Sequence, residues 1–258
     1  MGGLSPYTAL LQRARTLVDI EHALLDAAMR EAAPSASGQL LDVGCGDKPY
    51  ESLFAPWVTR YVGLEFQETY SVGVSGSSRP RADVVYHGGT LPFDDASFDT
   101  VLSNQVFEHV RDPRAFFAEL ARVLRPGGRL IVTVPFSYRV HAAPHDYHRF
   151  TRYSLAEYAR QTGLTVERLT PRGGFWSVIG QKLTSQMAVR FARLTGDIQT
   201  IGGFSYEERV LRRPRYWTLP VLAPLIVGVA ATAKLLDRVD FDDSDTLGYL
   251  MIASRPAR

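Results

Sequence analysis

The stretch LLDVGCGDKP, residues 40–49, decides the fold of this chain. An apolar run that leads directly into DVGCG, residues 42–46, is typical of a strand followed by a nucleotide-binding turn. Gly44 and Gly46 carry no Cβ, so the backbone of the turn can pass within contact distance of a ligand. The stretch therefore predicts a ligand held against the end of a strand.

A second apolar stretch, YVGLE at residues 61–65, ends in an acidic residue. Glu65 lies 21 residues after Gly44, about the spacing at which a carboxylate at a strand end binds the ribose of an adenosine-type ligand. The dinucleotide fingerprint G-x-G-x-x-G needs a third glycine, and Pro49 stands at that position. We therefore expect a nucleoside ligand without a pyrophosphate rather than NAD.

Two further segments extend this pattern. LPFDDASFDTVLSNQVFEHV occupies residues 91–110, and LARVLRPGGRLIVTVP occupies residues 120–135. With DVGCG and YVGLE they span about 95 residues in order, which is far more specific than one glycine-rich turn. On these four features the chain resembles the class I S-adenosylmethionine-dependent methyltransferases, in particular the type 11-like members. The resemblance implies an enzyme whose cofactor is S-adenosyl-L-methionine.

Apolar runs alternate with helical stretches, which predicts an α/β fold with a parallel sheet and helices on both faces. Such a sheet has its ligand loops at the carboxyl ends of the strands. By resemblance, residues 247–254 form the last, antiparallel strand of a Rossmann-like, seven-stranded methyltransferase sheet, in a hairpin with residues 164–169. The other strands are expected at residues 39–43, 60–64, 82–86, 98–103 and 129–134.

Helices are expected around this sheet. Residues 6–32 have apolar side chains at helical spacing, which predicts one helix or a broken pair. Ser154 and Glu157 are expected to form a capping box at the start of a helix over residues 154–162 that ends at Gly163. About 75 residues, 172–245, separate the last two strands, and connections this long seldom lack structure of their own.

We therefore expect a helical insertion in residues 172–245, with helical stretches at 175–194 and 216–238. A chain of 258 residues with 45% hydrophobic content can bury a full core. The whole chain, 1–258, is expected to form a single methyltransferase domain. Its parts are N-terminal helices (1–34), a cofactor-binding core (35–171), the helical insertion (172–245) and the last strand (246–258).

Composition indicates an intracellular protein. Cys45 is the single cysteine, which excludes an internal disulfide and fits a reducing compartment. No charged segment followed by an apolar one opens the chain, so export is not expected. The 29 basic and 27 acidic residues are spread along the sequence and give no footprint for nucleic acid. We expect a cytoplasmic protein.

The resemblance also implies cofactor contacts. The methionine end of S-adenosylmethionine is expected over the glycine turn, where backbone groups and Asp42 can meet its ammonium and carboxylate groups. Glu65 is expected to bind the ribose. Asn104 and Gln105, just past the fourth strand, are placed to contact the methionyl part or the acceptor. The turn itself consists of Val43, Gly44, Cys45 and Gly46.

The adenine pocket departs from the family pattern. Many members have an aspartate four residues before the leucine of LPF, and this chain has His87 there. A neutral imidazole can stack on the base or form a hydrogen bond with it through either nitrogen. Backbone groups of Gly88 and Gly89 are the alternative contacts.

An acceptor hydroxyl or amine must lose a proton, so a base is expected near the methyl group. One candidate is His109 in FEHV, which can equally be a packed or capping residue. The other candidates lie in HAAPHDYHRFTRY, residues 141–153, after the fifth strand. There we expect His145, oriented by Asp146, to be the general base. The alternative is a hydrogen-bonded loop that merely covers the cofactor.

A third interpretation of this loop is a metal site. Its ligands would be His141, His145, Asp146 and His148. Imidazole and carboxylate groups suit zinc or iron, but these spacings match no known metal motif. No metal is therefore expected from the sequence.

An apolar segment, YWTLPVLAPLIVGVAATA at 216–233, is flanked by basic residues. Its length barely reaches that of a spanning helix, and a crossing would separate the last strand from its sheet. We reject a crossing and keep two interpretations, a helix buried within the insertion and peripheral membrane contact through residues 216–236 on the cytoplasmic leaflet. Pro220 and Pro224 are expected to make the element bent or two-piece.

The function expected is methyl transfer to an oxygen, or less readily a nitrogen, of a small-molecule, sugar or lipid-linked acceptor. Similar sequences with a P-H-D-x-x-R-[FY]-T loop often accompany sugar and cell-envelope biosynthesis, which is an analogy only. A non-catalytic S-adenosylmethionine-binding or scaffold protein is the main rival. A dehydrogenase is a distant third.

Overall fold

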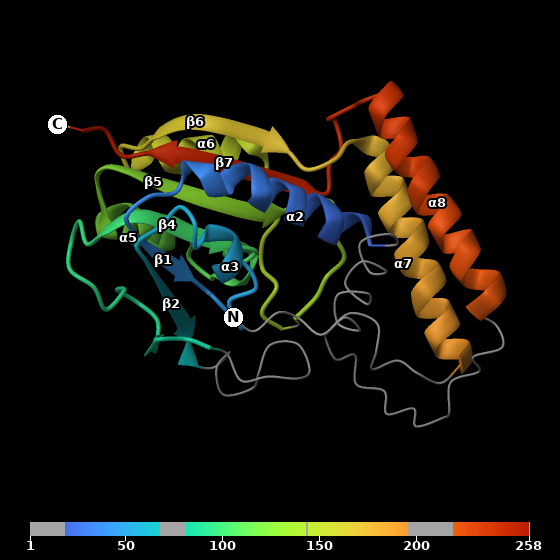
Figure 1. Cartoon of the computed structure of the whole chain (residues 1–258), viewed down its shortest axis with the longest axis horizontal. Helices are drawn as coiled ribbons and strands as arrows, with labels where there is room; N and C mark the ends of the chain where they lie inside the picture. Colours follow the sequence, from blue (N-terminus) through green and yellow to red (C-terminus); the bar gives the residue numbers. More distant parts are fainter. Residues whose placement is uncertain (1–18, 68–80, 143, 196–218, 258) are drawn as a thin grey trace. The chain divides into compact units, whose positions relative to one another are not determined.

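The structure is a computed structural model that describes residues 19–67, 81–142, 144–195 and 219–257 (Figure 1). The chain divides into two compact units. The core unit consists of residues 28–171 and 248–258. The helical unit consists of residues 1–27 and 172–247.

The core unit is built on a seven-stranded sheet in the order β3-β2-β1-β4-β5-β7-β6. Neighbouring strands are parallel except that β7 runs antiparallel to β5 and to β6. The expected Rossmann-like methyltransferase sheet is confirmed. The strands are β1 Gln39–Val43, β2 Arg60–Phe66, β3 Val84–Tyr86, β4 Phe98–Asn104, β5 Leu124–Pro135, β6 Thr165–Pro171 and β7 Gly248–Ser254.

Helices cover both faces of this sheet, because successive side chains of a strand point to opposite faces. Leu41 of β1 joins a buried cluster with Phe117 of α5 (Pro113–Val123) and Leu155 of α6 (Arg152–Gln161). Leu40 joins a second cluster with Met29 of α2 (Ile20–Ala32). The shorter helices are η1 Ala33–Ser35, α3 Glu51–Phe54 and η2 Phe107–His109.

Strand β5 begins earlier than the segment 129–134 that the sequence indicates. Phe98 pairs with Leu124, and the next pair is Thr100 with Arg129, so the RPGG segment makes an irregularity inside the strand. Strand β3 begins later than expected, at Val84. The sequence therefore located the strands and missed some of their ends.

Helix α6 begins before the predicted capping box. Its N-cap is Thr151, whose Oγ1 accepts a hydrogen bond from the backbone N–H of Ser154 at 3.2 Å. The Glu157 carboxylate instead accepts hydrogen bonds from the side chains of Arg160 and Gln161. The prediction of Ser154 as the cap was wrong because the segment TRYS offers two hydroxyl residues three positions apart, and the earlier one caps the helix.

The helical unit contains α7 (Phe175–Thr195), α8 (Leu219–Val239) and the first turns of α2. The side chains of Ile20, Val178, Ala230, Ala233 and Leu247 form its buried cluster. The Asp237 carboxylate accepts hydrogen bonds from the backbone N–H groups of Gly174 and Trp176, which stabilises the start of α7. The expected helical insertion before the last strand is confirmed.

Helix α8 is continuous from Leu219 to Val239, so the predicted break into two pieces was wrong, and the predicted bend stays a prediction. Pro224 lies within it, and Pro220 is its second residue. Proline has no backbone N–H, so Pro224 cannot donate a hydrogen bond to the carbonyl oxygen of Pro220. This lost bond lies in the first turns of the helix, where several backbone N–H groups have no partner within the helix in any case. Residues 6–18 and 216–218 lie outside the described residues.

The apolar side chains of α8 divide between two environments. Ala230 and Ala233 are buried, whereas Leu225, Leu235 and Val239 are 56%, 58% and 74% exposed. Among the residues that the structure describes, none of the helices has the length and apolarity that crossing a bilayer requires.

Candidate active site

The carboxyl ends of β1, β2, β4 and β5 lie at one edge of the sheet, because these strands are parallel neighbours. After β1 the chain builds β2 and β3 on one side, and it then returns to build β4 on the other side. Open α/β sheets bind ligands at such a switch point. The glycine turn after β1 and the histidine-rich loop after β5 both lie at this edge.

Gly44 and Gly46 serve different purposes in the turn. Gly44 has φ 77°, and a Cβ there would lie 2.4 Å from Cγ2 of Val106, so a side chain does not fit. Gly46 has φ 53°, and a Cβ there would meet no atom of the described residues within 4 Å. The backbone at Gly46 therefore faces open space. This arrangement fits a ligand that lies against the turn.

Glu65 is held directly beside this open space. Its Oε2 accepts a hydrogen bond from the backbone N–H of Gly46 at 2.8 Å, and its Oε1 accepts one from Phe66 at 2.9 Å. The residue is only 4% exposed, and burial raises the pKa of its carboxyl group despite these two hydrogen bonds. The spacing in the sequence thus correctly brings Glu65 to the turn.

Asp42 lies under the same turn, where it is 4% exposed. The hydroxyl of Tyr61 donates a hydrogen bond to its Oδ2 at 2.6 Å. Burial raises the pKa of Asp42 to about 7, in spite of that hydrogen bond. The thiol of Cys45 is also buried, and burial raises its pKa. Cys45 therefore contributes its backbone to the turn.

Lys48, to which the sequence analysis assigned no role, supports the turn. Its Nζ lies 2.6 Å from Oδ2 of Asp83, which also accepts a hydrogen bond from the backbone of Gly63 at 2.7 Å. The side chain of Lys48 is only 5% exposed. In the sequence, this ion pair could have been suspected from a lone basic residue after the glycine turn and an aspartate just before β3.

The remaining cofactor candidates lie around the same strand ends. His87 and Gly88 are exposed, and Gly88 has φ 91°. Asn104 Oδ1 accepts a hydrogen bond from Oγ1 of Thr133 at 2.5 Å, and Gln105 Nε2 donates one to the same Oγ1 at 3.2 Å. Thr133 of β5 thus fixes both side chains where β4 ends.

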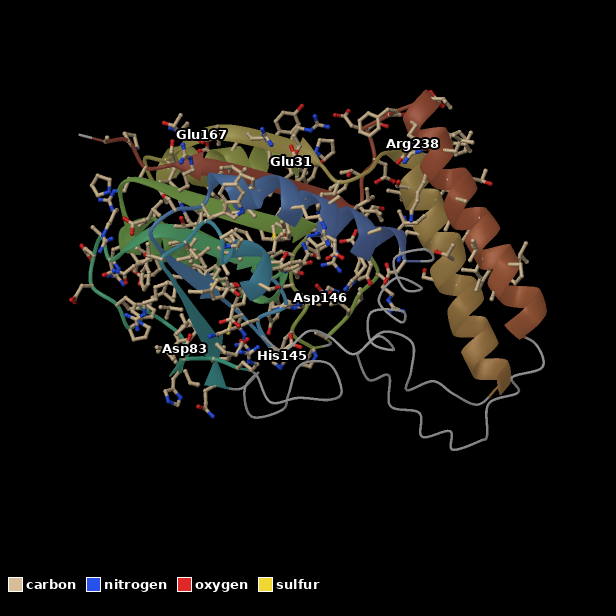
Figure 2. All side chains as sticks on the ribbon, in the orientation of Figure 1. Glu31, Asp83, His145, Asp146, Glu167 and Arg238 are labelled. Atoms are coloured by element: carbon tan, nitrogen blue, oxygen red, sulfur yellow. The ribbon has the colours of Figure 1, made fainter. Side chains whose placement is uncertain are left out.

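The loop after β5 is organised differently from the expected dyad. The Asp146 carboxylate accepts hydrogen bonds from Arg149 at 2.6 and 2.8 Å and from the backbone N–H of His141 at 2.8 Å. His145 Nδ1 contacts the hydroxyl of Tyr147 at 3.0 Å. Figure 2 labels His145 and Asp146. Asp146 therefore orients Arg149 and His141, and the predicted pairing of His145 with Asp146 was wrong.

The electrostatics of Asp146 agree with this arrangement. Burial alone would raise its pKa, but the hydrogen bonds from Arg149 and from the backbone of His141 outweigh that effect and lower it. Asp146 is accordingly an ionised residue that holds the loop together.

Glu108, His109 and His141 form a compact cluster at the same edge. Oε1 of Glu108 is 3.8 Å from Nε2 of His109 and 3.8 Å from Nε2 of His141. The Glu108 side chain is 0% exposed, and burial lowers the pKa of both histidines. Sequence reasoning named the histidines and missed Glu108, although a Glu-His pair directly after β4 was a usable signal.

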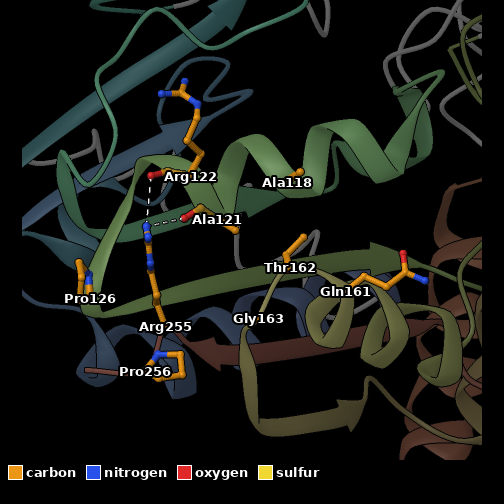
Figure 3. A pocket seen from close by; sticks show the side chains of 9 residues that line it. All are labelled: Ala118, Ala121, Arg122, Pro126, Gln161, Thr162, Gly163, Arg255 and Pro256. Carbon is orange, nitrogen blue, oxygen red and sulfur yellow. Dashed lines mark hydrogen bonds between the residues drawn. The ribbon is translucent and has the colours of Figure 1, made fainter. Parts of the chain in front are cut away.

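A separate depression of ≈ 440 Å³ lies elsewhere on the core unit (Figure 3). Arg255 and Pro256 in its lining follow β7, whose last residue, Ser254, pairs with Arg129 near the amino end of β5. The depression is therefore at the edge opposite the glycine turn. Its lining residues are Ala118, Ala121, Arg122, Pro126, Gln161, Thr162, Gly163, Arg255 and Pro256.

Residues 41–132 match a family described as a methyltransferase domain. A probable S-adenosylmethionine-dependent methyltransferase of Mycolicibacterium smegmatis is 39% identical over 108 residues, which is 41% of this chain and 41% of that protein. An uncharacterized methyltransferase of Mycobacterium marinum is 35% identical over 167 residues, which is 61% of this chain and 62% of that protein. The chain thus spans between 41% and 62% of the length of these curated relatives.

In three dimensions the chain is similar to an S-adenosylmethionine-dependent methyltransferase from Mesorhizobium loti, with a TM-score of 0.51 and 15% sequence identity. The match covers 92% of this chain and 100% of that one. The fold is that of a Rossmann-like α/β protein, with a glycine turn and a strand-end carboxylate at one edge of its sheet. Residues 41–132 match the methyltransferase domain family, and the chain is similar to S-adenosylmethionine-dependent methyltransferases, whose cofactor is S-adenosylmethionine.

Proposed function

We propose that this chain transfers a methyl group from S-adenosylmethionine to an oxygen, or a nitrogen, of a small-molecule, sugar or lipid-linked acceptor, as a single domain over residues 1–258. One observation carries the proposal. Glu65 and the open face of Gly46 lie at the same sheet edge as the histidines that follow β4 and β5. A cofactor site and a set of candidate bases are thus neighbours.

The proposed cofactor contacts follow from the positions of these residues. Backbone groups of residues 43–46 and the Asp42 carboxylate receive the methionine end, and Glu65 receives the ribose. His87 and Gly88 meet the adenine. Asn104 and Gln105, which Thr133 holds in place, contact the methionyl part or the acceptor.

S-adenosylmethionine supplies a methyl group that its sulfonium already activates, so the protein chiefly aligns the acceptor and removes a proton. His145 is the proposed general base. When its Nδ1–H donates to Tyr147, its Nε2 carries the lone pair that accepts the proton. Asp146 positions the loop through Arg149 and His141, and His109 is the alternative base.

A lipid-linked acceptor would be reached at a membrane surface, and peripheral contact through residues 216–236 of a cytoplasmic protein belongs to this proposal. The exposed side chains of Leu225, Val227 and Leu235 support it. Flotation with anionic vesicles measures such contact, and a protein that stays wholly unbound at low salt would remove this part of the proposal.

The function is tested by incubating the purified chain with S-adenosylmethionine and pools of hydroxylated acceptors, including sugars, phenols and lipid extracts. We expect the demethylated cofactor to form only when an acceptor is present, and mass spectrometry to find the methylated product. Tight cofactor binding without product from any pool would favour the scaffold protein. A rise in melting temperature with NAD and none with S-adenosylmethionine would favour a dehydrogenase.

The pKa of Asp42 predicts how cofactor affinity depends on pH. Burial raises this pKa to about 7, so the carboxyl is mainly protonated below that pH. The ammonium group of the cofactor favours the carboxylate, so affinity is expected to rise toward pH 7 and to level off above it. The slope below pH 7 is at most about tenfold per pH unit. Calorimetry over about pH 5 to 8 measures it.

Asp42→Asn is the matched variant. It should bind the cofactor more weakly at pH 8 and lose this pH dependence, and an unchanged profile would show that Glu65 or another group causes it. The pKa of Asp42 is higher in the folded protein than in the unfolded chain. Its contribution to stability therefore falls as pH rises from the ordinary pKa of an aspartate to about 7. The variant should therefore melt at a higher temperature than the wild type above pH 7.

A further inference from the structure

Three side chains with metal-ligating atoms converge where the carboxyl ends of β4 and β5 lie in the core unit. The ligand atoms of Glu108, His109 and His141 all lie within 4.8 Å of one another. Glu108 and His109 follow β4, and His141 follows β5, so the sheet brings them together across the sequence. We propose that Glu108, His109 and His141 bind a divalent transition-metal ion.

The first supporting observation is the orientation of His109. Its Nδ1 lies 2.7 Å from the backbone carbonyl oxygen of His145. A carbonyl oxygen can only accept, so Nδ1 carries the proton and Nε2 carries the lone pair. That lone pair is on the nitrogen that lies 3.8 Å from Oε1 of Glu108. Metal-binding histidines are commonly oriented through the other nitrogen in this way.

His141 is oriented in the same manner by different partners. Its Nδ1 lies 3.3 Å from the backbone carbonyl oxygen of Arg139 and 3.3 Å from Oδ2 of Asp146. Both are acceptors, so the proton again belongs on Nδ1 and the lone pair on Nε2. Arg149 holds the Asp146 carboxylate through two hydrogen bonds. This gives a carboxylate–histidine arrangement behind the proposed metal.

The three ligand groups also form an electrostatic pattern that suits a cation. Two imidazole lone pairs and a carboxylate point toward one another, and the Glu108 side chain is 0% exposed. Electron-rich groups this close repel one another in a buried site, and a divalent ion between them converts that repulsion into attraction.

The donor set indicates the kind of metal. Two imidazoles and one carboxylate occur in catalytic zinc sites and in non-haem iron sites, both of which keep open coordination positions. Metal–ligand bonds of about 2.0 to 2.2 Å place ligand atoms about 3 to 3.5 Å apart. The two contacts of 3.8 Å must therefore shorten by about half an ångström, and the ligand atoms of the two histidines, which lie within 4.8 Å of each other, by at most about 1.5 Å; side-chain rotation supplies such shifts. His109 keeps 28% of its side chain exposed, so one side of the site is accessible.

The role of the metal rests on the proposed function. An acceptor hydroxyl that binds at an open position loses its proton more readily, because the metal ion stabilises the oxyanion. The O–H bond breaks and the proton passes to His145, the new O–C bond forms, and the methyl–sulfur bond breaks to leave a neutral thioether. The site therefore favours oxygen acceptors, above all those with a second oxygen that can also bind the metal.

The test uses the full chain, stripped of metal with a chelator and titrated with Co²⁺, whose visible absorption reports its coordination. We expect one equivalent to bind. Glu108→Gln, His109→Ala and His141→Ala should each weaken binding by more than the roughly 10- to 100-fold that loss of a second-layer partner costs. His145→Ala is the matched control, because it keeps the backbone carbonyl that orients His109 and should bind Co²⁺ as the wild type does.

The result that overturns the proposal is a folded wild-type protein that binds neither Co²⁺ nor Zn²⁺, or variants that bind as tightly as it does. Circular dichroism and cofactor affinity check that each variant folds. If buried Glu108→Gln fails to fold, the two histidine variants decide. If methyl transfer proceeds at its full rate in the presence of a chelator, the proposed role of the metal is refuted and the proposed methyltransferase function stands. If the protein binds the metal at this site but transfers no methyl group, the metal site stands and the proposed function is refuted.

Discussion

Turnover in His145→Ala is expected to fall by about a hundred- to ten-thousandfold, the usual cost of removing a general base. S-adenosylmethionine should bind to the variant with unchanged affinity. The reason is position, since His145 follows β5 and the cofactor turn follows β1. Its side chain is exposed and its Nδ1 contacts Tyr147, so replacement by alanine leaves the core packing intact. Single-turnover kinetics at saturating cofactor measure the chemical step.

His22→Ala supplies the control for this variant. His22 belongs to the helical unit, and its side chain is 39% exposed, so its replacement should leave turnover unchanged. Full activity in His145→Ala together with an inactive His109→Ala that still binds Co²⁺ would identify His109 as the base. A loss of cofactor affinity in His145→Ala would instead place the loop in the cofactor site.

The second large effect is expected on cofactor affinity. Glu65→Ala removes a charge-assisted pair of hydrogen bonds to the ribose, which should cost about 2 to 4 kcal/mol, or roughly 30- to 1,000-fold in affinity. The carboxylate is already fixed by the N–H groups of Gly46 and Phe66, so little order is lost when the ribose binds. Calorimetry with the demethylated cofactor measures the change without turnover.

Two variants separate the carboxylate from the fold. Glu65→Gln keeps an oxygen for the Gly46 N–H group, so it should fold like the wild type and show an intermediate loss. Glu167→Ala removes a surface carboxylate that pairs with Arg129, and it should leave affinity unchanged. Unchanged affinity in a folded Glu65→Ala would refute Glu65 as the ribose ligand.

Sequence reasoning located the sheet and the glycine turn because local signals determine them. Apolar runs bounded by turns mark strands that must be buried, and DVGCG with Glu65 at its fixed spacing follows from strands of regular length. The spacing indicated that Glu65 lies near the glycine turn, whereas its hydrogen bond with the backbone of Gly46 was not predicted.

The contacts of the loop after β5 could not be predicted in the same way. His145 and Asp146 are adjacent in sequence, but the chain turns at this point, with the backbone N–H of His145 donating to the carbonyl oxygen of Ala142, so the two side chains contact different residues. Asp146 consequently meets Arg149 and His141, while His145 meets Tyr147. Glu108 was overlooked because its partner His141 is 33 residues away and reaches it only through the pairing of β4 with β5.

The way in which the chain leaves and re-enters the sheet bears on how this protein could diversify. Pro171, the last residue of β6, pairs with Tyr249 at the start of β7, so the two ends of segment 172–247 are neighbours. The sheet already holds these two ends together, and the entropic cost of closing a loop grows only slowly with the length of the loop. Lengthening, shortening or rewriting this segment therefore leaves the register of the strands, and with it the glycine turn and Glu65, as they are. Related proteins could therefore carry different helices in this segment and keep the same core unit.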